Sequence, residues 1–315
     1  MGVKIKNNIP ADGKDPLARC LRKAISKTNI AFVNQGYDFV FEMANGLKNP
    51  EPNTIAFERI DGCQIRNRSL LVDPNVVKLV KMYHCPELEA NNAPCVDGRL
   101  FTRMLTDKQW TPPKPEVAKK DFSKIVCGLN FLHYDVLDTL ADHAAERSSS
   151  PDRPVDLFFA GTTMYKAGGG LSGALISQHR RSAVEACRGL ASGDNEVWDT
   201  MAFSRQEYHR RILKAKVLVS PWGWGEACYR DYEAILCGCA LVKPMAYPIR
   251  SMDGIYADGQ TYWCLPDWSD LAEVVSQALI EYEGMTNQRY SRRLKLLRSR
   301  SWSAQVSLLE RLVRH

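Results

Sequence analysis

The chain has 315 residues, of which 45% are hydrophobic and 25% are charged. This composition is typical of globular proteins, and the length corresponds to roughly two domains of about 150 residues each, which excludes a disordered, collagenous or coiled-coil protein. Lys and Arg exceed Asp and Glu by 42 − 36 = 6, a mild basic excess that favours acidic ligands without requiring nucleic acid. Since no run of about 18 apolar residues occurs, we expect neither signal peptide nor membrane span, and a cytoplasmic location.

Cysteine and histidine spacing gives no indication of a metal site. The chain has 10 Cys and 6 His but no CxxC, HxxxH, HxH or DxD pattern. Cys127, Cys237 and Cys239 lie in apolar runs, where a free thiol behaves as a small core residue. We therefore expect reduced cysteines and no bound metal.

The first half mixes predicted strands and helices, and prolines make residues 85–120 mostly loop. The segment 147–154, RSSSPDRP, is the most linker-like stretch, so we predict domains at 1–150 and 151–288, followed by a basic helical tail at 289–315. In chain order, the patterns predict an amphipathic helix within 12–27, a buried strand at 29–33, a turn at 34–36, helix 37–47, strand 54–57, helix 76–83, strand 124–129 and helix 133–146.

Beyond the linker, strands and helices alternate. This order predicts parallel β-α-β units and hence a Rossmann-like second domain. The predicted strands are 155–160, 217–220, 240–243 and 260–264, and the predicted helices are 175–190, 203–214, 229–236 and 271–283.

The most informative segment is SPWGWGEACYRDYEAILCGCALVKP, residues 220–244. Gly223 and Gly225 allow close approach of a ligand to the backbone, and the helix that opens behind them offers a positive N-terminus to a diphosphate. Arg230 lies one turn into that helix, and Lys243 ends the next strand, so both cations are expected at one sheet edge. Glu233 shares a helix face with Arg230, and its carboxylate suits a vicinal ribose diol. The alternative is that Arg230 and Glu233 simply pair with each other.

This segment resembles the donor-binding region of GT-B glycosyltransferases, in particular a bacterial and viral group with the signature SPxGxGExCxRDxEA, and more distantly exostosin-like and fucosyltransferase-like enzymes. The resemblance implies two Rossmann-like domains with parallel sheets facing a cleft, and a nucleotide sugar held by the second domain. It implies Glu233 for the ribose and Arg230 for the diphosphate, with Lys243 as a weaker candidate. Tyr229 and Glu226 of the same segment join the predicted site, Glu226 as a catalytic candidate that contacts the sugar.

Upstream residues of the second half complete the predicted donor site. Gly161 and Thr162 follow the first strand of that half, and Arg180 lies on the next predicted helix, where it could reach a phosphate. For a general base in the first domain we favour Asp38, ahead of Asp61 and His133, as a carboxylate close behind a strand end.

The tail at 289–315 has eight basic residues against one acid, with leucines interleaved. Such a basic amphipathic helix packs back on the first domain, which we favour, or lies on an anionic membrane as a peripheral contact.

We therefore expect a metal-independent glycosyltransferase that moves a sugar from a nucleotide-sugar donor to a glycan or lipid-linked acceptor hydroxyl. No cofactor is expected besides that donor substrate, and no nucleic-acid partner. The alternative is a non-enzymatic nucleotide- or polyanion-binding protein on the same fold. A phosphoryl-transfer enzyme is disfavoured because GxxxxGK[ST] does not occur and no GxGxxG directly follows a predicted strand.

Overall fold

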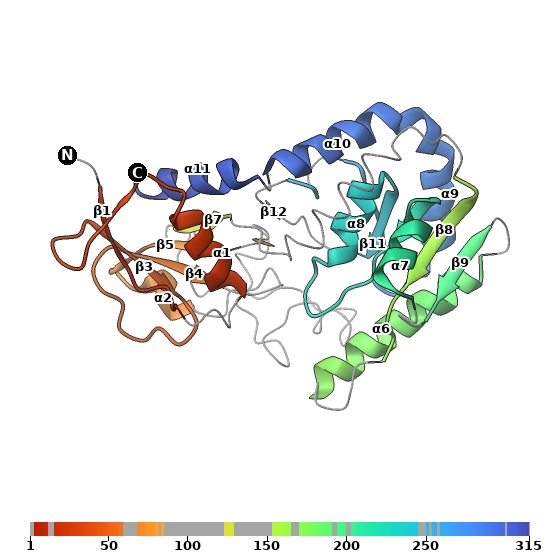
Figure 1. Cartoon of the computed structure of the whole chain (residues 1–315). Helices are drawn as coiled ribbons and strands as arrows, with labels where there is room; N and C mark the ends of the chain where they lie inside the picture. The colour runs from red at the N-terminus through yellow and green to blue at the C-terminus, as the bar shows by residue number, and fades with distance from the viewer. Residues whose placement is uncertain are drawn as a thin grey trace.

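The computed structural model describes residues 3–11, 16–58, 68–81, 83–84, 123–128, 153–164, 170–190, 194–199, 203–244, 250–251, 254–256, 259–299 and 301–314. Within them, two separate parallel β-sheets dominate, one in each half of the chain (Figure 1). This confirms the predicted fold class of two Rossmann-like α/β domains. The predicted helix at 133–146, with His133, and the base candidate Asp61 lie outside the described residues.

The first sheet has strand order β2-β1-β3-β4-β5-β7, and every pair is parallel. Helix α1 (Pro16–Ile25) covers one face, where it shares a core with Phe41, Phe57 and Val80, and α2 (Arg68–Val72) packs on the other. The strands are β1 (Lys4–Asn7), β2 (Ala31–Phe32), β3 (Phe39–Met43), β4 (Thr54–Glu58), β5 (Val76–Lys81) and β7 (Ile125–Cys127).

Two helices predicted in this half are wrong, because both segments are strands. Residues 39–43, FVFEM, form β3, and residues 76–81, VVKLVK, form β5. Both runs are rich in aromatic or β-branched residues, which favour a pleated, half-buried surface. Asp73 accepts a hydrogen bond from the Asn75 amide at 2.8 Å, so it forms a turn into a strand and not a helix cap. The strand predicted at 29–33 shrinks to the exposed edge strand β2, and β1 was missed.

The second sheet has order β13-β11-β10-β8-β9 and is also entirely parallel. Helices α7 (Arg205–Ile212) and α8 (Tyr229–Cys237) cover one face, and α6 (Gly170–Arg188) and α9 (Leu271–Tyr282) cover the other. All eight predicted elements of this half are present. The strands are β8 (Val155–Ala160), β9 (Asn195–Trp198, not predicted), β10 (Ala215–Val219), β11 (Ala240–Pro244) and β13 (Thr261–Cys264).

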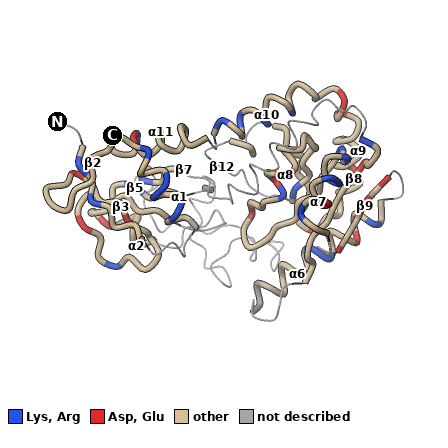
Figure 2. The backbone as a smooth tube through the Cα atoms, in the orientation of Figure 1, with Lys and Arg blue, Asp and Glu red and all other residues tan. Residues whose placement is uncertain are grey.

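The C-terminal residues form two helices that connect the domains (Figure 1). After the short η3 (Glu283–Met285), α10 (Thr286–Ser299) places Leu296 in the second-domain core, whereas α11 (Trp302–Leu312) places Leu308 and Leu309 in the first-domain core. The favoured prediction, a tail that packs back on the first domain, is confirmed for α11, whereas the part of that tail in α10 packs on the second domain. Figure 2 shows Lys and Arg along α1, which packs beside α11.

A small antiparallel ladder also joins the two halves. Strand β6 (Tyr83–His84), just after β5, pairs with β12 (Arg250–Ser251), just after β11. The described strands of the first sheet end at Cys127 and those of the second begin at Val155. A boundary near residue 150 stays a prediction between these limits.

Candidate functional site

The candidate site lies at the carboxyl edge of the second sheet. Strands β8, β10 and β11 are adjacent and parallel, so the segments that follow them emerge side by side. Gly161 follows β8 directly, and residues 221–228, here called the site loop, connect β10 to α8. The structure thus brings together the two glycine-containing segments that the sequence analysis singled out.

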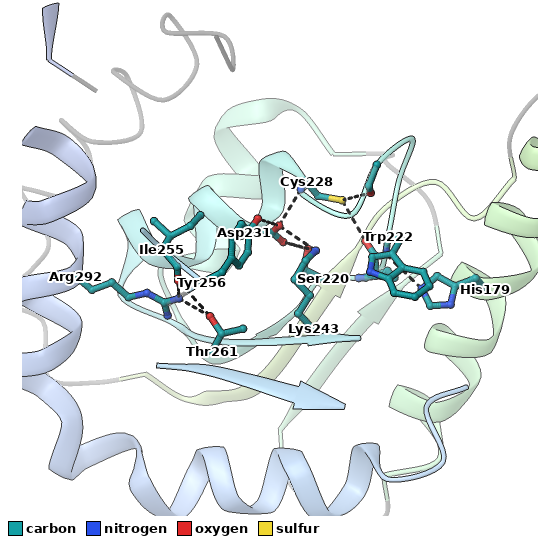
Figure 3. A network of polar contacts seen from close by, with 12 residues as sticks. His179, Ser220, Trp222, Cys228, Asp231, Lys243, Ile255, Tyr256, Thr261 and Arg292 are labelled. Carbon is teal, nitrogen blue, oxygen red and sulfur yellow. Dashed lines mark hydrogen bonds and ion pairs between the residues drawn. The ribbon is translucent and has the colours of Figure 1, made fainter. Parts of the chain in front are cut away.

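A buried carboxylate, Asp231, ties the site loop to the start of α8 (Figure 3). The Cys228 amide donates to it at 2.8 Å and the Tyr256 hydroxyl at 2.5 Å, and the Ser220 hydroxyl also donates. The Lys243 ammonium forms an ion pair with it at 3.0 Å. These contacts hold the loop backbone in one arrangement before any ligand arrives.

Lys243 therefore has a different role from the predicted one. It is fully buried, and its charge is matched by Asp231. A lysine in a closed ion pair has no charge to offer to a diphosphate, so we remove it from the site. The sequence analysis missed Asp231, although an acid in the first turn of a helix is a recognisable signal for contact with the helix N-terminus.

Arg230 is a buried cation at this edge. Its side chain is 7% exposed, Nη2 donates to the Ala160 carbonyl at 2.7 Å, and the guanidinium lies 5.2 Å from the centre of the Phe159 ring. Among the described residues no carboxylate forms an ion pair with it, and its buried Nε has no hydrogen-bond partner. A buried charge is costly unless it is hydrogen-bonded or paired, so Arg230 is a candidate for contact with an anion.

Gly161 lets Arg230 reach this position. A Cβ atom at residue 161 would lie 2.3 Å from Nη2 of Arg230 and 3.4 Å from Nη2 of Arg180. Arg180 Nη1 also donates to the carbonyl of the exposed Thr162, at 2.8 Å. Two buried guanidinium groups thus converge on the end of β8, from α8 and from α6.

Glu233 is buried and forms no ion pair with Arg230, although the two charges interact. It is 8% exposed, and its Oε2 accepts a hydrogen bond from the Tyr208 hydroxyl at 2.9 Å. The simple surface pairing of Arg230 with Glu233 is therefore wrong. Burial raises the pKa of Glu233, and the charge of Arg230 opposes that rise. Burial and then the Glu233 charge raise the pKa of Tyr208, which keeps the phenol protonated and donating.

The remaining predicted residues of the site loop and of the first position of α8 differ in exposure. Glu226 is buried, Gly223 donates its amide to the Gly225 carbonyl at 3.2 Å, and Tyr229 is 41% exposed at the first position of α8. The neighbouring Trp224 is exposed as well. The loop thus combines a closed turn with aromatic side chains on its outer surface.

Asp38, the predicted catalytic base, lies at the wrong edge of the first sheet. It precedes β3 and does not follow a strand, and its carboxylate accepts the Lys4 amide at 2.7 Å, where β1 begins. Functional groups of parallel α/β sheets gather at the carboxyl ends of the strands, whereas Asp38 lies at the amino ends. The wrong helix predicted at 37–47 caused this error.

An aromatic stack that was not predicted supports the other side of the site loop. The His179 ring contacts Trp222 and Trp268, with ring centroids 4.9 and 5.1 Å away. Its Nε2 accepts the Trp222 amide at 3.3 Å (Figure 3). Burial, together with the charge of Lys243, lowers the pKa of His179 to about 3. The imidazole is therefore neutral at neutral pH and acts as a fixed acceptor for the loop backbone.

The shifted pKa of His179 predicts a loss of stability in mild acid. Between the ordinary imidazole value of 6.5 and about 3, the unfolded chain binds a proton that the folded chain does not. The free energy of unfolding should fall by up to about 1.4 kcal/mol per pH unit as pH drops through this window. Urea unfolding at pH 7 and pH 5, followed by tryptophan fluorescence, measures it. The His179→Gln variant lacks this titrating group, so its free energy of unfolding should fall less steeply with pH, by the contribution of one bound proton. An unchanged pH dependence in the variant would contradict the lowered pKa of His179.

The described part of the chain offers no metal site, in that no three His, Cys, Asp or Glu side chains are grouped to hold an ion. The fold and site define a two-domain parallel α/β protein with two buried guanidinium groups at one sheet edge. No protein-family model matches the chain, and no curated protein matches it. A solved α1,3-fucosyltransferase structure is similar at 9% identity and a TM-score of 0.42, covering 100% of this chain and 90% of that one.

Proposed function

We propose that the protein is a glycosyltransferase that binds a nucleotide-sugar donor at the carboxyl edge of its second sheet. One observation supports this above the others: the buried Arg230, which forms no ion pair with a described carboxylate, lies one turn from the buried carboxylate of Glu233 on the same helix. A nucleoside diphosphate carries an anion and a diol a few bonds apart, and these two groups are complementary to it.

Arg230 and Arg180 are the proposed diphosphate ligands. Both guanidinium groups approach Gly161, where the absence of a side chain leaves room for them. Guanidinium donors form short charge-assisted hydrogen bonds to phosphate oxygens. The amide dipoles at the start of α8 add positive potential at the same edge of the sheet, although the Asp231 carboxylate already neutralises part of it.

Glu233 is the proposed ribose ligand. Tyr208 donates to Oε2 and fixes the carboxylate, whereas Oε1 receives no hydrogen bond from a described residue. An oriented, partly desolvated carboxylate oxygen is a strong acceptor for a hydroxyl group. The raised pKa of Glu233 would fall once ribose hydroxyls donate to its charged form.

The reaction follows from this placement. The oxygen of the acceptor hydroxyl forms a bond to the anomeric carbon, the bond from that carbon to the diphosphate oxygen breaks, and the hydroxyl proton passes to a base. Arg230 and Arg180 stabilise the charge on the departing diphosphate, so the mechanism needs no divalent metal. Glu226, buried in the site loop, remains the proposed sugar-side catalytic group, and a glycan or lipid-linked hydroxyl is the proposed acceptor.

A donor screen in excess EDTA tests the proposal. UDP, GDP, CMP and ADP sugars are incubated with the protein, and release of the free nucleotide is followed with and without candidate glycan acceptors. We expect one donor class to be turned over in EDTA. Turnover restored only by Mn²⁺ or Mg²⁺ would contradict the metal-independent mechanism, and absence of binding to every nucleotide by calorimetry would contradict the proposed function.

A further inference from the structure

Helices α1 and α11 form one continuous outer surface of the first domain. Both pack on the same face of the first sheet, where Leu17 and Leu21 of α1 share a core with Leu308 and Leu312 of α11. The Lys23 ammonium lies 4.6 Å from the centre of the Trp302 ring, which joins the two helices at one end. Their solvent-facing sides therefore point the same way, away from that sheet.

This surface is strongly basic. Its exposed charged side chains are cationic, its other exposed side chains include Ser26, Ser303 and Ser307, and its described acid is the half-buried Glu310, which lies 3.8 Å from Arg314. Helix α1 itself contains no acidic residue. We call the following exposed residues the basic face: Arg19, Arg22, Lys23, Lys27, Arg311 and Arg314.

The basic face is distinct from the donor site. It belongs to the first domain, whereas Arg230 and Glu233 lie on the second sheet, and in Figure 2 α1 and α8 lie in opposite halves of the molecule. Only a few described contacts within the protein use the positive charges of this face. Among its side chains, those with described contacts reach only the Ile9 carbonyl, the Trp302 ring and Glu310.

We propose that the basic face docks the protein on an anionic lipid bilayer. A layer of two helices offers its cations side by side to a plane of negative head groups, and each Lys or Arg near such a surface adds attraction that fades within a Debye length. Trp302, beside the basic face, is partly buried and lies under the Lys23 ammonium, so its ring is not open for stacking on bases of single-stranded nucleic acid. None of the described helices combines the length and hydropathy needed to span a bilayer. Binding would therefore be peripheral.

Vesicle co-sedimentation with the full chain tests this inference. Vesicles of phosphatidylcholine alone are compared with vesicles that also contain phosphatidylglycerol, at low and high salt. The variant Arg19→Glu/Lys27→Glu/Arg311→Glu reverses three charges of the basic face and leaves Lys23 on Trp302. The matched control, Lys48→Glu/Arg188→Glu/Lys214→Glu, makes the same change in net charge at exposed positions elsewhere.

We expect the wild type to bind only the anionic vesicles, and less at high salt. Each basic residue lost lowers the partition coefficient about fivefold, so the basic-face variant should bind at least about 100-fold more weakly, while the control stays within a few-fold of wild type. Circular dichroism and unchanged nucleoside-diphosphate affinity establish that the variant is folded. Equal loss in both variants, absence of vesicle binding, or tighter binding to an oligonucleotide than to the vesicles would overturn the inference. The donor screen is unaffected by any of these results.

Discussion

Replacing Arg230 with Gln should weaken nucleoside-diphosphate binding about 100-fold, because two charge-assisted hydrogen bonds to phosphate are lost and each contributes about 1.5 kcal/mol or more. The substitution removes the charge and keeps a donor for the Ala160 carbonyl, so the fold should survive. Isothermal titration calorimetry on the variant gives the affinity.

The control for this experiment is Arg210→Gln, the same substitution at an exposed position of α7. It should leave the affinity within a few-fold of wild type. The nucleoside without phosphates adds a second comparison, since Arg230→Gln should barely change its binding. Equal affinity of folded Arg230→Gln and wild type for the diphosphate would remove Arg230 from the site.

Replacing Asp231 with Asn should destabilise the second domain by about 3–5 kcal/mol, because it leaves the Lys243 ammonium buried without its counter-charge. Chemical denaturation measures this loss. Hydrogen exchange should also become faster in the site loop, since the Cys228 amide loses its charged acceptor.

A double variant separates charge from packing. Asp231→Asn combined with Lys243→Met removes both charges, and it should recover a large part of the lost stability. If the single variant is as stable as wild type, Asp231 is not what holds the loop. If the double variant is less stable than the single one, the ion pair is not the source of the effect.

The second domain was predictable from sequence because its signals are local. Its strands β8, β10 and β11 are short apolar runs bounded by turn residues, as expected for parallel strands buried on both faces. Helix α8 also ends at Gly238, which has a φ of 73° and closes the helix in the left-handed region. The same features predicted the site loop between β10 and α8.

The errors in the first domain arise where local pattern is ambiguous. The runs that form β3 and β5 are only five and six residues long, and each gains its strand hydrogen bonds from neighbours distant in sequence. The pattern predicts a helix where β3 forms, and this places Asp38 at the wrong edge of the first sheet. A single wrong element thus produced a wrong catalytic candidate.

The sequence predicted which residues lie near the carboxyl edge of the second sheet, but not the hydrogen-bond or ion-pair partner of each one. Arg230 was expected to pair with Glu233 or bind phosphate, yet it donates to Ala160, 70 residues away. Lys243 was expected at the ligand and instead neutralises Asp231. Tyr208 and His179 gave no signal in one sequence, since their roles depend on helices that meet only after folding.

The central claim is that Glu233 holds the ribose of a nucleotide bound to the second domain. Calorimetric titration of wild type and Glu233→Ala with a nucleoside diphosphate and with its 2′-deoxy and 3′-deoxy analogues tests it most directly. We expect wild type to lose at least about tenfold in affinity when a ribose hydroxyl is removed, the loss of a hydrogen bond to a charged group. The Glu233→Ala variant should bind all three ligands equally and about as weakly as wild type binds the deoxy forms. If Glu233→Ala still discriminates against the deoxy analogues as strongly as wild type does, Glu233 does not contact the ribose and the site is elsewhere.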